Sequence, residues 1–242
     1  MSKHPIDTLH PPGFRPGHAH PEADYLELSR LSAKLGLPVP QIHLTLSACD
    51  AAGARTAHYH ARSHTFNRNF WNYIFGITAV APNGTATFAA GFLAMKDTGN
   101  TVRAINFGAG GNYMADFFGQ AGAANSARGI VAGIGSTAES FEHNALTTQC
   151  VNGNGVNQFG YDAQLATTVA YTAGTKTWDA TIRRLLHNNS AATIVVTEIG
   201  IIAYGPATFN FLLQRDLLAV PINVLAAGQL TATYTYSLTF PA

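Results

Sequence analysis

The chain has 242 residues with 14 basic and 13 acidic side chains, and charged residues make up only 11% of it. Ordinary soluble domains carry roughly 25%, and charges that nearly cancel give no field that would attract nucleic acid or an anionic membrane. The length is sufficient to bury a core without disulfide bonds, and two cysteines cannot form a disulfide framework. We therefore expect no nucleic-acid or membrane partner, and a weakly charged surface that associates with protein.

The first segment of the chain, residues 1–40, is predicted to be an arm followed by a helix. Residues 1–22 are rich in proline, glycine and histidine, a composition that disfavours both helix and sheet. We expect an extended arm that becomes ordered along a neighbouring subunit, with Pro11, Pro12 and Phe14 among its contacts. The amino terminus lacks the apolar core of a secretory signal, so we expect synthesis in a cytoplasm.

Helical spacing occurs twice in a sequence that otherwise has β character. Apolar residues three and four apart predict a short amphipathic helix over 22–35. A second, aromatic-rich helix docked on a sheet is predicted within 65–75. The stripe of the first helix consists of Tyr25, Leu28, Leu31 and Leu35.

Residues 41–242 are predicted to form a β-sandwich body with a loop-rich insertion at 108–128. Short strands without long helices between them favour an antiparallel sandwich or jelly roll over a parallel sheet. The fold class we expect is therefore mainly β, with one or two short helices. The predicted strands cover 41–47, 101–107, 129–133, 156–161, 165–171, 177–186, 193–203, 209–215, 222–225 and 229–240, and a hairpin or strand is expected at 82–95.

The last of these strands has two different faces. Apolar residues alternate with hydroxyl residues along 229–240, so the two sets point to opposite sides of a sheet. A hydroxylated but uncharged strand face suits contact with other protein. The predicted contact residues are Thr231, Thr233, Thr235, Ser237 and Thr239.

Several segments of the body have a recognisable pattern: GIVAGIGSTAESFEHNAL at 129–146, TIRRLLHNNSAATIVVTEIG at 181–200, LQRDLL at 213–218 and the closing Thr-Tyr-Thr strand, with FNRNFWN at 66–72 upstream. Together they resemble a β-sandwich module of tailed-bacteriophage virion proteins, and FNRNFWN resembles a segment that precedes such modules. The resemblance covers roughly residues 64–240. It implies a structural role in a virion and brings no active-site residues with it.

The histidines are the best candidates for metal chemistry. His58 and His60 would share one face of a strand, with His64 four residues later, and two imidazoles on one face can bind a metal. The next acidic residue is Asp97, so no carboxylate completes a ligand set nearby. We expect a polar strand end here, with no metal and no cofactor.

Other patterns of catalysis are incomplete. The glycines at 108–111 lack the lysine of a phosphate loop, and 133–136 lacks the spacing of a nucleophile elbow. Glu198 lies in an apolar run, where a charge needs a partner. A hairpin at 188–189 would supply Arg183 or Arg184, and Arg215 could join the same network.

The sequence therefore predicts a non-catalytic virion component, most directly a capsid decoration or cement protein. Its expected partners are copies of itself, as a trimer or other ring, and phage capsid or tail proteins. Alternatives are a tail or fibre-base component, or a receptor- or glycan-binding module with aromatic stacking residues. The candidate stacking residues are Tyr113, Phe117 and Trp178.

Overall fold

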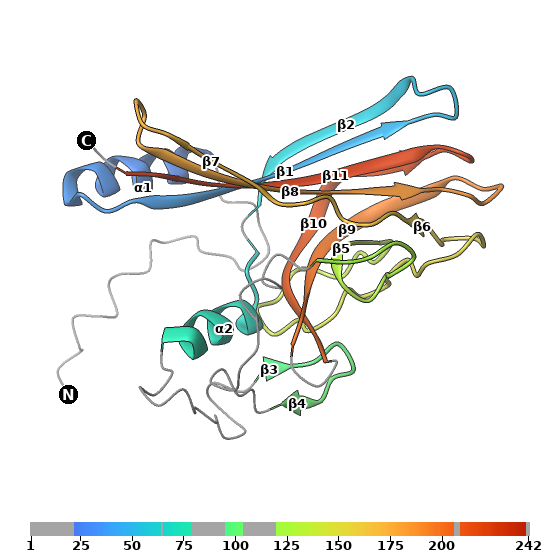
Figure 1. Cartoon of the computed structure of the whole chain (residues 1–242), viewed down its shortest axis with the longest axis horizontal. Coiled ribbons are helices and arrows are strands. Elements are labelled where there is room, and N and C mark those ends of the chain that lie inside the picture. The colour runs from blue at the N-terminus through green and yellow to red at the C-terminus, as the bar shows by residue number, and fades with distance from the viewer. Residues whose placement is uncertain (1–21, 64, 79–94, 104–119, 206–208, 241–242) are drawn as a thin grey trace.

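The computed structural model describes residues 22–63, 65–78, 95–103, 120–205 and 209–240. These residues form two antiparallel sheets packed face to face, a two-stranded ribbon and two helices (Figure 1). The predicted β-sandwich is confirmed. The predicted arm, with Pro11, Pro12 and Phe14, lies outside the described residues, as do His64, Tyr113 and Phe117.

The larger sheet, which we call sheet A, has six strands, and its order is β2-β1-β11-β8-β6, with β7 also paired to β8. The closing strand therefore lies in the middle of the sheet, where both of its edges are hydrogen-bonded. The strands are β1 (Val39–Cys49), β2 (Arg55–Arg62), β6 (Gly160–Tyr161), β7 (Thr168–Thr172), β8 (Thr177–His187) and β11 (Gln229–Thr239).

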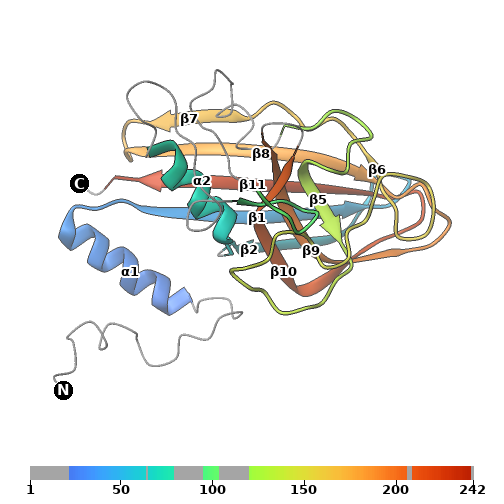
Figure 2. The same cartoon turned by 90° about the horizontal axis from the view of Figure 1, so that it is seen from below.

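The smaller sheet, sheet B, has the order β10-β9-β5 and faces one end of sheet A (Figures 1 and 2). Its strands are β5 (Gly129–Gly133), β9 (Ile194–Tyr204) and β10 (Asn210–Val224), and the ribbon pairs β3 (Met95–Lys96) with β4 (Val102–Arg103). The strands predicted at 209–215 and 222–225 are one strand. Irregular pairing between Leu217 and Ile222 lets β10 continue past Pro221, whose missing N–H would otherwise interrupt a ladder.

Alternation of apolar and polar residues explains how the sheets pack. Ile42, Leu44 and Leu46 of β1 are buried, whereas the residues between them are partly exposed. Leu230, Ala232 and Tyr234 of β11 follow the same period, so both strands turn one face towards sheet B. The core between the sheets is completed by isoleucine, leucine and valine from β8, β9 and β10.

The two predicted helices are present. α1 (Glu22–Leu35) coincides with the predicted span, and α2 (Arg68–Thr78) begins and ends about three residues later than predicted. Tyr73 of α2 joins Phe211 and Leu213 of β10 in a second apolar cluster. α2 therefore covers β10, whereas α1 lies beside the end of sheet A at which β1 begins (Figure 2).

The hairpin predicted at 188–189 is wrong. β8 belongs to sheet A and β9 to sheet B, so the connection crosses between layers. The Asn188 side chain supports this crossing, because its Nδ2 donates to the carbonyl oxygens of Ala192, Val224 and Leu225. The bonds to Val224 and Leu225 hold the crossing segment against the end of β10, and the bond to Ala192 closes the segment on itself.

Candidate functional site

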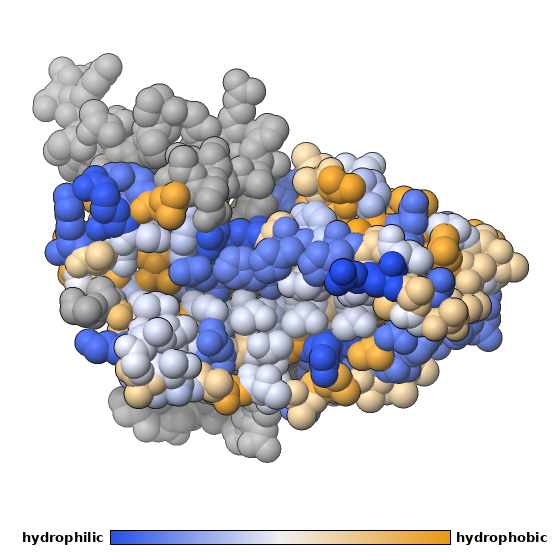
Figure 3. Space-filling view, turned by 90° about the horizontal axis from the view of Figure 1, so that it is seen from above, coloured by the Kyte–Doolittle hydropathy of each residue, from blue (hydrophilic) through white to orange (hydrophobic). Residues whose placement is uncertain are grey.

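The outer face of sheet A is a broad polar surface, and α1 contacts its margin through Tyr25, whose ring lies under Arg62 of β2. Register places Thr231, Thr233, Thr235 and Ser237 of β11 on this face, and their partners on β1 and β8 are polar except for Leu185. Figure 3 shows the face as mostly blue and white, with orange patches towards its margins. We call this surface the outer face.

The hydroxyl row on β11 is uncharged, but its neighbours are not. Arg183 of β8 is paired with Thr233, and Asp179 is paired with Ser237, whose hydroxyl donates to the Asp179 carboxylate. On the other side of β11, Thr45 and His60 continue the row of Thr233. The outer face is therefore rich in hydroxyls and imidazoles and carries sparse charges of both signs.

The histidines expected to share a strand face do so. His58 and His60 are both exposed on β2. The Nδ1 atom of His60 is hydrogen-bonded to Thr45 Oγ1 at 2.9 Å, and its ring stacks on His43 with centroids 5.2 Å apart. Among the described residues, no group of three or more histidine, cysteine or acidic side chains could hold a metal ion.

The apolar stripe of α1 is exposed. Leu28, Leu31 and Leu35 are 50%, 43% and 70% exposed. The helix is attached through Tyr25, whose ring lies under the Arg62 guanidinium at 3.5 Å from the ring centroid. We call these three leucines the leucine stripe. The sequence predicted the stripe, but it did not indicate that the described part of the body would leave these leucines exposed.

Sheet A extends beyond sheet B at the end where β7 lies (Figure 1). The inner side of this extension is aromatic, because Tyr171 of β7 is paired with Trp178 of β8, which is paired in turn with Leu238 of β11. Tyr171 is 61% exposed, and Trp178 is partly buried. Trp178, a predicted stacking residue, thus lies beside a second aromatic side chain that the sequence did not single out.

Glu198 and Arg215 form an ion pair inside the fold. Glu198 is fully buried and accepts hydrogen bonds from the Arg215 guanidinium at 2.6 Å and from the backbone of Gly135 and Thr148. Burial alone would raise the pKa of Glu198, but these donors outweigh it and lower the pKa below its usual value. The partner is Arg215, because β9 pairs with β10 and not with β8.

Gly133 and Gly135 allow the backbone to approach the Glu198 carboxylate closely. A Cβ atom on Gly133 would lie 2.6 Å from Glu198 Oε1, and one on Gly135 would lie 2.5 Å from the same oxygen. Only glycine therefore lets the backbone approach the carboxylate closely enough to donate. The 133–136 segment, which lacks the spacing of a nucleophile elbow, therefore helps to bind the buried carboxylate.

Arg184, a predicted partner of Glu198, binds backbone oxygens. Its side chain is fully buried, and burial lowers its pKa to about 10, which leaves it cationic at neutral pH. It donates five hydrogen bonds of 2.6–3.2 Å to carbonyl oxygens. The acceptors are Gly122, Asn125, Arg128, Ile130 and Asp162. One side chain thus fixes the 120–130 segment onto sheet A.

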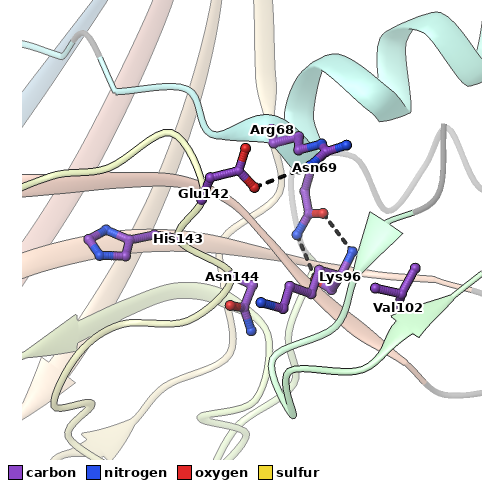
Figure 4. Close-up of a pocket in the computed structure, with 7 residues that line it drawn as sticks. All are labelled: Arg68, Asn69, Lys96, Val102, Glu142, His143 and Asn144. Atoms are coloured by element: carbon purple, nitrogen blue, oxygen red, sulfur yellow. Dashed lines mark hydrogen bonds and ion pairs between the residues drawn. The ribbon is translucent and has the colours of Figure 1, made fainter. Parts of the chain in front are cut away.

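A pocket of about 210 Å³ lies between α2, the β3–β4 ribbon and the 142–144 loop (Figure 4). The side chain of Asn69 bonds both the N–H and the carbonyl of Lys96, and Arg68 pairs with Glu142 at 3.3 Å. His143 points away from the other labelled side chains and accepts from Arg215 at 3.1 Å. Burial, with the Arg215 charge, lowers the pKa of His143. These contacts join three elements, and the lowered pKa favours the neutral form of the imidazole.

No protein-family model, curated protein or solved structure matches the chain. None of the described helices is both long and apolar enough to cross a bilayer.

Proposed function

We propose that this protein is a non-catalytic structural component of a tailed-phage virion, most directly a capsid decoration or cement protein. It acts through protein–protein contacts with copies of itself, in a trimer or other ring, and with capsid or tail proteins. The resemblance of segments within 64–240 to virion modules supports the virion part of the proposal. The exposed surfaces support the assembly part.

The leucine stripe is the observation that carries the proposal. A helix that presents Leu28, Leu31 and Leu35 to water loses the hydrophobic gain that normally holds an amphipathic helix in place. Each fully buried leucine contributes roughly 1.5–3 kcal/mol, so covering the stripe with another chain would be strongly favourable. The helix also lies directly after the predicted arm, which would extend the same contact.

The outer face supplies a second, more polar contact. Its hydroxyl and imidazole groups can pair with backbone or side-chain groups of another protein without the cost of burying many charges. Thr235 and Thr181 already share a hydrogen bond of 3.4 Å across β11 and β8. Hydrogen bonds within the face therefore hold part of this surface in place before any partner binds.

A receptor- or glycan-binding module is the second candidate function. The neighbouring rings of Tyr171 and Trp178 on the sheet extension favour it, because sugars stack on exposed aromatic side chains. Binding to a glycan array that is lost in Tyr171→Ala would support this alternative. If the protein acts only as a cement protein, the same variant should bind particles as well as the unmodified chain does.

The virion role can be tested on particles. Gold-labelled antibodies against the purified chain should mark intact tailed-phage particles of the source at regular positions on the shell in electron micrographs. Labelling confined to the tail would favour the tail component. Purified particles without any of this protein would contradict the virion proposal.

Lysines on the outer face should weaken assembly more than folding. In Thr233→Lys/Thr235→Lys, two added charges would be desolvated in any contact that uses this face, and we expect at least a tenfold loss of self-association or particle binding. The exposed residues Thr101 and Thr193 provide a matched control as Thr101→Lys/Thr193→Lys. Equal binding of both double variants and the unmodified chain, measured by co-sedimentation, would remove the outer face from the interface.

A further inference from the structure

A buried hydroxyl and a buried amide meet between the two sheets. Ser63 follows β2 of sheet A, and Gln214 lies on β10 of sheet B. Ser63 is 7% exposed and Gln214 is 1% exposed. The Nε2 atom of Gln214 contacts the Ser63 hydroxyl, although 151 residues separate the two positions in the sequence. The pair therefore bridges the layers at a site that bulk water hardly reaches.

A carboxylate is aimed at both members of this pair. Ser63 Oγ donates to Asp216, at 2.8 Å from Oδ1 and 2.9 Å from Oδ2. Gln214 Nε2 lies 3.3 Å from Asp216 Oδ2. Tyr234 and Thr65 also donate to this carboxylate, at 2.7 and 3.1 Å. Asp216 can thus accept a proton from the hydroxyl and deliver it to the amide nitrogen without moving away from either.

The amide oxygen has its own donor. The Tyr236 hydroxyl lies 2.8 Å from Gln214 Oε1. Burial raises the pKa of Tyr236 far above its usual value, so the phenol stays protonated and donates. A donor fixed on a carbonyl oxygen stabilises the negative charge that develops there when a nucleophile adds to the carbonyl carbon.

We propose that Ser63 and Gln214 join in an internal ester cross-link after the chain has folded. Asp216 takes the proton from Ser63 Oγ as this oxygen bonds to Cδ of Gln214. The Cδ–Nε2 bond then breaks, and Asp216 passes the proton to the departing nitrogen. The products are an ester between the two side chains and one molecule of ammonia, so atoms and charge balance without an oxidant or a cofactor.

The folded structure supplies what this acyl transfer needs. Holding the hydroxyl against the amide replaces a bimolecular encounter by an intramolecular one, for which effective concentrations are very high. In the structure the Gln214 N–H faces the Ser63 hydroxyl. The amide plane must therefore turn so that Oγ can reach Cδ. Ammonia that diffuses away draws the reaction forward, and scarce water protects the ester from hydrolysis. The cross-link would tie sheet A covalently to sheet B, which suits a protein that must withstand stress in an assembled particle.

The intact mass of the purified full-length chain under denaturing conditions tests the proposal. We expect a mass lower by one ammonia than the sequence requires. A tryptic digest should contain the peptides 63–68 and 185–215 as one cross-linked species. A chain with the full encoded mass, or one in which these two peptides are separate, would overturn the proposal. The digest is needed because succinimides at Asn-Gly pairs, such as 152–153, also lose ammonia.

Two variants separate the roles. Ser63→Ala removes the nucleophile, so it should retain the ammonia and yield separate peptides. Tyr236→Phe removes only the donor to the amide oxygen, and the rate of cross-linking should fall about 100-fold or more, which a time course after refolding would show as delayed loss of mass. Ser47→Ala on the outer face is the matched control and should cross-link normally. Loss of ammonia that persists in Ser63→Ala would also overturn the assignment.

Discussion

Arg184→Met is expected to lower the free energy of unfolding by about 3–5 kcal/mol, a large part of the roughly 5–15 kcal/mol that stabilises an ordinary domain. The variant keeps an apolar stem but leaves the carbonyl oxygen of Ile130, which is buried, and four partly buried carbonyl oxygens without this donor. Arg184→Lys should also destabilise strongly, because an ammonium group has three donors and cannot reproduce the guanidinium fork. Urea denaturation followed by circular dichroism measures both effects.

The adjacent residue provides the control. Arg183 precedes Arg184 on β8 but points to the outer face and is exposed. Arg183→Met should change the free energy of unfolding by no more than about 0.5 kcal/mol, as for most surface substitutions. Equal stability of the two methionine variants would show that the carbonyl cluster does not depend on the buried guanidinium.

Glu198→Ala is expected to cost about 3–5 kcal/mol, because it leaves the Arg215 charge buried without its counterion. The pair is deeply buried, at 0% and 2% exposure of the two side chains. Glu142→Ala removes the acid of the exposed pair with Arg68 and should cost less than about 1 kcal/mol. The comparison uses two carboxylates that each bind an arginine and differ in burial.

Glu198 should also make the fold sensitive to acid. Its folded-state pKa is lowered from the usual 4.5, so the unfolded chain binds the proton more readily. The resulting stabilisation is present above pH 4.5 and is lost as the pH falls through the lower, folded-state pKa. In Glu198→Gln the dependence of unfolding on pH below 4.5 should be shallower. An unchanged slope in that variant would mean that other carboxylates govern acid unfolding.

The β architecture could be predicted from the sequence because local periodicity reports which face of a strand is buried. The alternation in 229–240 correctly separated the core residues Leu230, Ala232 and Tyr234 from the outward hydroxyls. The α1 span was likewise predictable, because leucines at helical spacing continue up to Leu35 and Gly36, which follows, ends the helix. In both cases the signal lies within a single element.

Pairing between elements could not be predicted in the same way. The turn residues at 188–189 have the composition of a hairpin, but the chain crosses between sheets there, and Glu198 therefore meets Arg215. The interpretation of Arg184 was wrong for the same reason, because its acceptors are backbone carbonyls, which leave no trace in the sequence. Exposure of the leucine stripe also depends on what the rest of the chain covers.

Sedimentation velocity of the full-length chain, over a dilution series, tests most directly whether the leucine stripe is an assembly surface. We predict a discrete oligomer for the unmodified protein and a folded monomer for Leu28→Glu/Leu31→Glu. Leu225→Glu is the control, since this leucine is 40% exposed on another part of the surface, and it should leave the oligomer intact. A monomer at every concentration of the unmodified chain, or an oligomer that the double variant does not dissociate, would contradict this account.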